Sequence, residues 1–537
     1  MGKRILRLFL HYGIITYGGL AVVLFAACRV FLEPLWTDLL AGFSGGSTAV
    51  SESFARQSLL LFCFLLWVYL YGCSLRDTVY RDATGRSYAN DRAKFQRGYF
   101  YLLHFFRLAD KNRIRPASLP EEDWKGAEGI ILGHCGKNLM KRPSAGVGNL
   151  ALFGRPGDGK TTSQIIPSAL RFDGSVLCID IKGDVLSWTK ENRRIKIFAP
   201  NDPAASCHFD PFDGLRQLSA DDRRAFIENT GFSLVPDEDG ENAAFFVDGA
   251  RDFWNGITHY MLAQDAGTTF IDVVNAILTG SAIPWVEKVA ASDIYEAKIY
   301  LASYLGTNEK NLNGQYKKLC DSLRPLTSGA LQNLLCAHDD AITPQLLDEG
   351  YDIYIEIPQE KMKIFAPVTS LVIQNFMAYF MGRPDSSSGV SLRPVLFLLD
   401  EFPQLHLDYE NVLLPGLATL RSKKVSFFLA MQSIASLERR YGEPGMREIM
   451  DNCGYISVMS AQDPKSRRFF QELIGKRQTL KVSTSEGSGG RSKQASKSVQ
   501  EAEEYVYRPE DFGSLQERVV VITGGKYIEA DQCRCYE

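Results

Sequence analysis

The chain has 537 residues, too many for one hydrophobic core, and at about 150 residues per domain it predicts three or four units. Its 45% hydrophobic and 23% charged residues are ordinary for a folded protein, so wholesale disorder is excluded. The net charge of −3 gives no overall attraction to nucleic acid, so any such binding must be local. The eleven cysteines are scattered without Cys-x₂-Cys motifs, which favours packing residues in a reducing compartment.

Two segments near the N-terminus, residues 8–28 and 57–75, contain no Asp, Glu, Lys or Arg. Each has about the length of a helix that crosses a bilayer. Basic residues precede the first segment and follow the second, whereas residues 33–56 carry three acidic residues and one arginine. The positive-inside rule therefore predicts a transmembrane hairpin over residues 1–75, with both termini in the cytoplasm. A cleaved signal peptide with a lipoprotein-like site at Cys28 is the alternative, but its apolar core would be unusually long.

After a juxtamembrane segment, residues 76–145, short apolar runs alternate with helix-compatible segments. This alternation predicts an α/β domain with a parallel sheet covered on both faces, made of residues 146–214 and 348–537. The expected strands are residues 148–153, 176–181, 195–198, 353–357, 395–399, 425–430, 455–459 and 519–522.

Residues 215–347 contain no short apolar run of the kind that predicts a strand and are compatible with helices throughout. This pattern predicts an all-α domain inserted into the α/β domain. The alternative, a separate domain on a linker, would need all strands of the α/β domain on one side. The expected helices are residues 220–230, 244–263, 269–276, 292–304, 312–323 and 330–337.

Residues 477–504 are polar and rich in Gly, Ser and Lys. This composition predicts a mobile surface loop. A solvated loop is favoured over a basic loop that contacts nucleic acid or a partner.

One octapeptide matches the phosphate-loop pattern G-x-x-x-x-G-K-[ST] in full: Gly154, Arg155, Pro156, Gly157, Asp158, Gly159, Lys160 and Thr161. It follows an apolar run and precedes a helix-compatible segment, residues 161–170, which is the strand–loop–helix context of a nucleotide site. The glycines let successive N–H groups point at a phosphate. Lys160 is expected at the β- and γ-phosphates, Thr161 at Mg²⁺, and Thr162 beside them. The alternative is a glycine-rich turn before a helix.

The apolar run 395–399 ends in two adjacent carboxylates, Asp400 and Glu401. In phosphate-loop enzymes an acidic residue at this place holds Mg²⁺, and a second one activates water. We therefore assign Asp400 to the metal and Glu401 to the catalytic base. The alternative is a strand that ends in a charged turn.

Three further polar positions stand at the ends of expected elements. Gln432 closes the run 425–430 and is placed to sense a γ-phosphate, although a turn residue would look the same. Arg421 precedes that run, either as a solvated residue or as one that reaches a neighbouring subunit's site. Asp180 ends another strand, where a group near the nucleotide and a simple turn are equally compatible.

Short motifs follow one another in a fixed order along the chain: Asp180-Ile-Lys182-Gly183, Phe209-Asp-Pro211-Phe, Phe253-Trp254, Leu398-Leu-Asp400-Glu401-Phe-Pro, Arg421…Gln432-Ser433 and Arg508-Pro-Glu-Asp511. Together with the phosphate loop and the N-terminal apolar segments, they resemble the type IV secretion coupling proteins, the TraG/TraD-type ATPases of bacterial conjugation. One departure is Asp158, where the family usually has Ser; its negative charge near the phosphates predicts modest nucleotide affinity.

The resemblance implies a RecA-like nucleotide domain with an inserted all-α domain, anchored in the bacterial inner membrane as a homohexamer. It implies ATP and Mg²⁺ between subunits, with Arg421 as an inter-subunit arginine finger and Gln432 as a nucleotide sensor. The implied partners are a relaxase–single-stranded DNA complex or effector proteins, and the components of a type IV secretion channel.

The favoured hypothesis is an ATPase that drives such substrates into the channel. One alternative is a membrane receptor for protein effectors that uses nucleotide as an assembly switch. Another is a chromosome-partitioning or DNA-packaging pump of the wider FtsK/HerA group, which the Phe253-Trp254 and Arg421…Gln432 segments fit less well.

Overall fold

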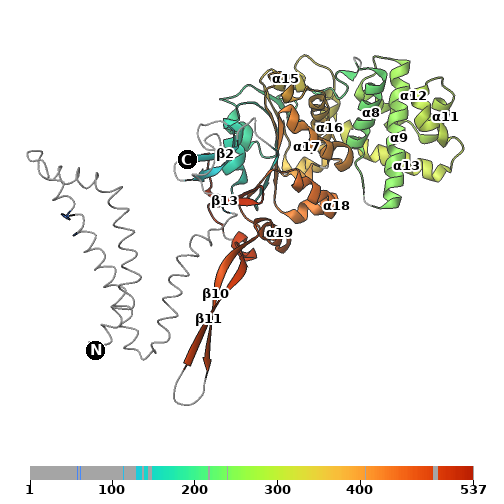
Figure 1. Ribbon diagram of the computed structural model, residues 1–537. Helices are drawn as coiled ribbons and strands as arrows, with labels where there is room; N and C mark the ends of the chain where they lie inside the picture. The colour runs from blue at the N-terminus through green and yellow to red at the C-terminus, as the bar shows by residue number, and fades with distance from the viewer. Residues whose placement is uncertain are drawn as a thin grey trace, which may run out of the picture. The chain divides into compact units, whose positions relative to one another are not determined.

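The computed structural model describes residues 57–58, 61, 113, 129–135, 138–142, 148–215, 218–238, 240–405, 407–487, 494–513 and 515–535 (Figure 1). The chain divides into two compact units, Met1–Ala109 and Asp110–Glu537. Only Gln57, Ser58 and Leu61 are described in the first unit, and all three are helical. The predicted transmembrane hairpin and Cys28 therefore lie outside the described residues.

An eleven-stranded mixed sheet forms the centre of the second unit, in the order β2-β1-β13-β12-β9-β3-β8-β7-β4-β6-β5. The seven strands from β9 to β5 are mutually parallel, whereas β12, β13, β1 and β2 pair antiparallel at one side. Their bounds are β1 Ile130–Cys135, β2 Asn138–Arg142, β3 Leu150–Phe153, β4 Ser175–Asp180, β5 Ile195–Phe198, β6 Asp352–Glu356, β7 Val395–Leu399, β8 Val425–Met431, β9 Tyr455–Val458, β12 Arg518–Thr523 and β13 Lys526–Asp531.

All eight expected strands are present, but the sheet is not parallel throughout, because β12 runs antiparallel to β9. The parallel strands read as continuous apolar runs because both of their faces are buried. In β7, Leu396 and Leu398 join one hydrophobic cluster, while Phe397 and Leu399 join the cluster on the other face. Both faces of the sheet are therefore covered by core side chains, as the alternating pattern predicted.

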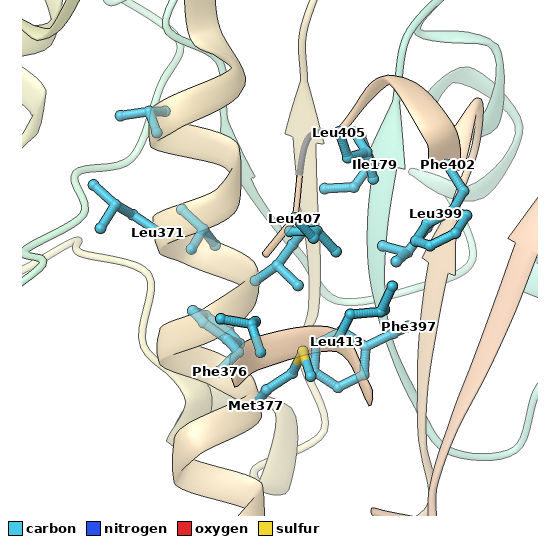
Figure 2. Close-up of a cluster of buried hydrophobic side chains, with 14 of the residues drawn as sticks. Ile179, Leu371, Phe376, Met377, Phe397, Leu399, Phe402, Leu405, Leu407 and Leu413 are labelled. Carbon is cyan, nitrogen blue, oxygen red and sulfur yellow. The ribbon is translucent and has the colours of Figure 1, made fainter. Parts of the chain in front are cut away.

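The helix α16 (Met362–Met381) belongs to the larger of these clusters. Figure 2 shows Phe376 and Met377 of this helix beside Leu413 and beside Phe397 of β7. Within the described part of the chain it is the one helix long and apolar enough to cross a membrane, but most of its length is buried inside the protein. Its apolar character is accounted for by packing against the sheet.

Smaller helices follow the strands: α6 (Ile166–Arg171), α7 (Asp184–Thr189), α17 (Leu414–Thr419), α18 (Ile434–Asp451) and α19 (Pro464–Ile474). A π-helical turn, Thr161–Ile165, precedes α6, so the expected helix after the phosphate loop is present with a wider first turn. π-helical turns of this kind are frequent at functional sites.

A helical segment lies between β5 and β6, two strands that are neighbours in the sheet. Its helices are α8 (Ala220–Leu234), α9 (Glu241–Gln264), α10 (Phe270–Thr279), α11 (Ala282–Ala290), α12 (Tyr295–Leu301), α13 (Glu309–Leu323) and α14 (Gly329–Leu334), and α15 (Pro344–Asp348) follows before β6. The six expected helices are found, and α11 is an additional one. Whether this segment is a separate domain, with boundaries at 215 and 347, stays a prediction.

Residues 476–505 correct one expectation. They form a two-stranded antiparallel ribbon, β10 (Lys476–Gly487) and β11 (Gln494–Tyr505), paired from Lys476–Tyr505 to Gly487–Gln494, where a mobile loop over 477–504 had been expected. The two strands pair with each other and not with the large sheet. Because the ribbon satisfies its backbone hydrogen bonds by local pairing, it needs few apolar side chains, and the polar composition misled the prediction.

Candidate nucleotide site

The phosphate loop follows β3, the middle strand of the eleven-stranded sheet, which pairs with β9 and β8. Gly157 and Gly159 have φ values of +91° and +84°, which side chains other than glycine rarely adopt. A Cβ atom on Gly159 would lie 3.0 Å from the Thr162 hydroxyl. Within the described chain, the backbone amides of Gly159, Lys160 and Thr161 have no hydrogen-bond acceptor. The loop thus presents unpaired N–H groups at a helix N-terminus, an arrangement suited to a phosphate group.

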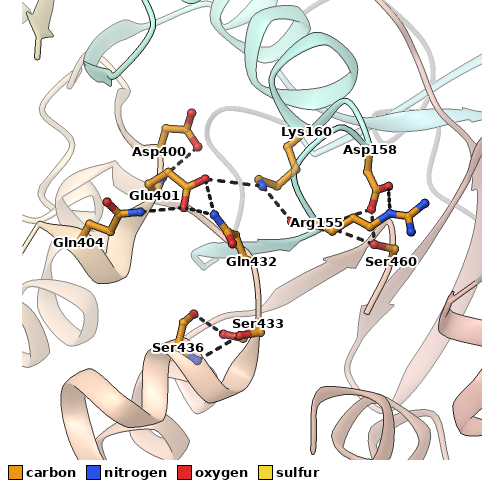
Figure 3. A network of polar contacts seen from close by, with 11 residues as sticks. Arg155, Asp158, Lys160, Asp400, Glu401, Gln404, Gln432, Ser433, Ser436 and Ser460 are labelled. Carbon is orange, nitrogen blue, oxygen red and sulfur yellow. Dashed lines mark hydrogen bonds and ion pairs between the residues drawn. The ribbon is translucent and has the colours of Figure 1, made fainter. Parts of the chain in front are cut away.

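Lys160 lies beneath this loop and is only 7% exposed. Its ammonium group donates a hydrogen bond to the Gly154 carbonyl at 2.8 Å and lies 3.8 Å from Glu401 Oε1 (Figure 3). A buried cation needs partners of this kind, because desolvation penalises its charge. The Lys160 charge is therefore held between the phosphate loop and the end of β7.

The two carboxylates follow β7 directly. Asp400 is 7% exposed, and burial, followed by the charge of Glu401, raises its pKa to about 6. Glu401 adopts a left-handed backbone conformation with φ +47°, and its N–H donates to Asp400 Oδ1 at 2.9 Å. Non-glycine residues in this conformation are uncommon and concentrate at functional sites.

Two amide side chains hold the Glu401 carboxylate. Gln432, at the end of β8, donates from Nε2 to Glu401 Oε1 and Oε2 at 3.1 and 3.0 Å. Gln404 donates more weakly to Oε2 at 3.4 Å (Figure 3). The carboxyl ends of β3, β7 and β8 thus bring Lys160, Glu401 and Gln432 together. Gln404 was not among the expected site residues, because it lies one position beyond the Asp400-Glu401-Phe-Pro motif, at the end of a 3₁₀ turn.

Asp158 is held by hydrogen bonds from another residue of the phosphate loop and from a residue that follows β9. Its carboxylate accepts hydrogen bonds from Arg155 Nε at 2.6 Å and from the Arg155 N–H at 3.1 Å, and the Ser460 hydroxyl donates to it (Figure 3). Pro156 and Gly157 form the turn between these partners. The Arg155 charge offsets the negative charge that the sequence places near the phosphates. Ser460 follows β9 and was not expected at the site.

The residues after the loop make contacts with the C-terminal segment. The Thr162 hydroxyl donates to the Gly159 carbonyl at 3.2 Å, and the Cys535 N–H donates to the Thr162 carbonyl at 2.8 Å. Ser163 donates to Gln532 Oε1 at 3.1 Å. These bonds fix the first helical turn, in which Thr161 is partly exposed at the first position. No motif in the sequence indicated that residues 532–535 support the loop.

The Asp180 carboxylate accepts hydrogen bonds from the N–H groups of Lys182 and Leu186 at 3.3 and 2.8 Å. The bond from Leu186 pairs an amide in the first turn of α7, and the bond from Lys182 holds the turn before it. Burial raises the pKa of Asp180, with hydrogen bonds from the following turn acting against it. These contacts are those of a structural turn, and a role of Asp180 near the nucleotide stays a prediction.

Arg421 is not near the other candidates. It lies in a short 3₁₀ turn, Leu420–Lys423, before the start of β8, whereas Gln432 follows its end. The seven residues of β8 separate the two by about 20 Å. Arg421 is exposed, and its side chain makes no hydrogen bond or ion pair with the described residues. It therefore lies at the amino ends of the parallel strands, whereas the phosphate loop of the same chain lies at their carboxyl ends.

The chemistry of the side chains and amides at this site is compatible with a magnesium–nucleotide pair. The Asp400 carboxylate and the Thr161 hydroxyl offer oxygen atoms, the kind of ligand that Mg²⁺ prefers, and the loop amides without an acceptor can donate to phosphate oxygens.

Comparison with known proteins shows the family to which the chain belongs. Residues 111–537 match the family model described as type IV secretory system conjugative DNA transfer. The chain belongs to this family. VirD4 proteins of Rhizobium rhizogenes and Agrobacterium fabrum are each 24% identical over 390 residues, covering 70% of this chain and 57% of theirs. The chain therefore spans little more than half the length of these curated relatives.

Solved structures show the same fold. The plasmid coupling protein TrwB in complex with the ATP analogue ADPNP superposes with a TM-score of 0.60 at 15% identity, over 78% of this chain and 92% of that one. TrwB in complex with ADP and Mg²⁺ gives 0.59 at 14% identity, over 78% and 93%. The mixed sheet with helices on both faces is the α/β fold of these coupling proteins and fits a RecA-like nucleotide domain.

Proposed function

We propose that this coupling-family member is an ATPase that recruits substrate to a type IV secretion or conjugation channel and drives its translocation by ATP hydrolysis. The single observation that carries the proposal is the cluster of Lys160, Glu401 and Gln432 beside the phosphate loop. ATP and Mg²⁺ are the proposed cofactors, in keeping with the ligands of the TrwB structures.

Each residue has a defined task in this proposal. Lys160, already desolvated, would exchange its contact with Glu401 for the β- and γ-phosphates. Glu401, freed on that side but still held by Gln432, would accept the proton of the attacking water. Asp400 and Thr161 would hold Mg²⁺, which when bound neutralises phosphate charge. Gln432 donates hydrogen bonds directly to the Glu401 carboxylate. If its side chain also contacts the γ-phosphate, the presence of that phosphate would change the position of Glu401.

Arg421 requires a second subunit in this scheme. An exposed arginine far from its own phosphate loop can complete the site of a neighbour in a ring. We therefore propose a homohexamer, anchored in the bacterial inner membrane by residues 1–75, with the α/β unit in the cytoplasm. The proposed substrates are relaxase-bound single-stranded DNA, effector proteins or both.

The test is ATP hydrolysis by the full chain in detergent, with and without single-stranded DNA. Stimulation by DNA that disappears in Lys160→Ala supports a DNA-coupled motor. Hydrolysis that is indifferent to DNA favours the alternative, a nucleotide-switched receptor for protein effectors. Hydrolysis that persists unchanged in Lys160→Ala would overturn the assignment of the site.

A further inference from the structure

The helical segment leaves and rejoins the sheet through two connections that lie against each other. His208 is in the connection after β5, and His338 and Asp340 are in the connection between α14 and α15. The Phe209 N–H donates to the Leu334 carbonyl at 2.8 Å, and the Ile342 N–H donates to the His208 carbonyl at 2.7 Å. The backbone therefore holds the three side chains of His208, His338 and Asp340 in one place.

These three side chains converge closely. Asp340 Oδ1 lies 2.5 Å from His208 Nδ1 and 2.7 Å from His338 Nδ1. The two imidazole rings are stacked, with centroids 4.0 Å apart and 22° between their planes. One ligand atom from each residue lies within 4.8 Å of the other two. Two nitrogens and one carboxylate oxygen thus lie close enough together to bind one ion.

Hydrogen bonding within the cluster favours the charged form of the Asp340 carboxylate. Burial acts to raise the pKa of Asp340, but hydrogen bonds from His208 and His338 lower it below its ordinary value. The thiol of the nearby Cys336 donates to the Asn333 carbonyl at 3.1 Å and does not belong to the group of converging ligand atoms.

We propose that His208, His338 and Asp340 bind a divalent transition-metal ion, with Zn²⁺ as the representative. Two imidazoles with one carboxylate is a ligand set of open zinc sites and leaves a position for water. Imidazole ligands disfavour Mg²⁺ and Ca²⁺, which take oxygen ligands. The His338 and Asp340 side chains are 54% and 41% exposed, so they have room to turn from hydrogen bonding to coordination.

A metal ion here would cross-link the two ends of the helical segment. His208 and His338 are 130 positions apart in the sequence. Closing so long a loop restricts the unfolded chain and fixes the folded connections to each other. The ion would therefore stabilise the attachment of the helical segment to the sheet without touching the nucleotide site.

The experiment titrates Zn²⁺ into the tag-free, nucleotide-free full chain in detergent against a competing indicator. His338→Gln and Asp340→Asn are compared with wild type, and His134→Gln, which removes an imidazole elsewhere, is the matched control. We expect one equivalent bound in the wild type and control, and affinity at least about tenfold weaker in both cluster variants. Zn²⁺ should also raise Tm in the wild type but not in those variants.

Co²⁺ substitution identifies the ligands. An absorption spectrum of nitrogen and oxygen ligation that is lost in His338→Gln supports the proposal. Thiolate charge-transfer bands, or equal Zn²⁺ affinity in wild type and both cluster variants, would overturn it. Because His338 is half exposed, nucleotide binding and far-UV circular dichroism should be unchanged in His338→Gln, which verifies that the variant folds.

Discussion

The Glu401 carboxylate accepts hydrogen bonds from Gln432 and Gln404 and lies near the Lys160 ammonium group. It is therefore the group of the candidate site that contacts the most other site residues. Glu401→Gln keeps the shape of the side chain but removes the base. We expect kcat for ATP hydrolysis to fall about 10²- to 10⁴-fold while nucleotide binding persists. Phosphate release and a fluorescent-nucleotide titration measure the two quantities. Glu410→Gln, the same change at an exposed position, is the control, and an unchanged kcat in Glu401→Gln would remove Glu401 from its proposed role.

The buried charge of Asp400 lowers the stability of the folded protein, and the proposed Mg²⁺ would compensate that charge. Burial raises its pKa from 3.8 to about 6, so between these pH values the folded protein holds a proton that the unfolded chain releases. The free energy of unfolding therefore falls as pH rises through this window. Asp400→Asn should stabilise the nucleotide-free protein above pH 6 by up to about 3 kcal/mol, and the difference should vanish near pH 4.

Urea unfolding of the wild type and Asp400→Asn at pH 7.5 and pH 4 measures this difference. The same variant should lose Mg²⁺-dependent nucleotide binding. An Asp400→Asn protein less stable than the wild type at pH 7.5 would show that the buried carboxylate is stabilised by partners other than those found.

Sequence reasoning located the residues at strand ends but not those in irregular turns. Lys160, Glu401 and Gln432 each follow an apolar run, and the carboxyl ends of parallel strands meet at one edge, so their proximity followed from the pattern. Gln404 and Ser460 contact Glu401 and Asp158 from positions that no periodicity marks. Their places depend on how distant loops pack. The catalytic and binding roles themselves stay predictions.

At the level of elements, seven of the eight strands expected from the sequence are the parallel strands of the large sheet, and the eighth is β12. The strands β1, β2 and β13, on the antiparallel side of the large sheet, and the β10–β11 ribbon were missed. Polar residues interrupt the apolar pattern in β2, β13 and the ribbon, and Gly and His interrupt it in β1. The helix α11 was missed because Pro284 breaks its pattern, although proline is tolerated in a first turn. Antiparallel pairing at one side also turned an expected parallel sheet into a mixed one.

The β10–β11 ribbon should be dispensable for folding. Its strands pair only with each other within the described residues, so replacing residues 478–503 with an Asn-Gly turn removes no strand from the large sheet. We expect the free energy of unfolding to change by no more than about 0.5 kcal/mol, as for surface changes. Urea denaturation followed by circular dichroism measures it. Val520→Asp in the buried strand β12 is the destabilising control, and an equally large loss on removing the ribbon would contradict its independence.

At the scale of the whole molecule, the proposed ring has a specific consequence. Lys160 and Glu401 lie together at the carboxyl ends of the parallel strands, whereas Arg421 of the same chain lies at their amino ends. If Arg421 completes a neighbour's site, Arg421→Ala should reduce hydrolysis about 10³- to 10⁵-fold with nucleotide binding intact. That loss alone would not distinguish an effect within the chain from one between chains, so mixed assemblies are needed.

Mixing Lys160→Ala with Arg421→Ala subunits should restore part of the activity that each lacks. A site formed by the intact Lys160 of one subunit and the intact Arg421 of the next would be complete, and random 1:1 mixing of a ring yields about a quarter of such sites. Mixing Lys160→Ala with Glu401→Gln should restore nothing, because both residues contribute to the same site of the same chain. ATP hydrolysis at a fixed total protein concentration measures both mixtures. Recovery in the first mixture only is the expected result; failure of recovery in assemblies shown to contain both subunits would mean that Arg421 does not act between chains.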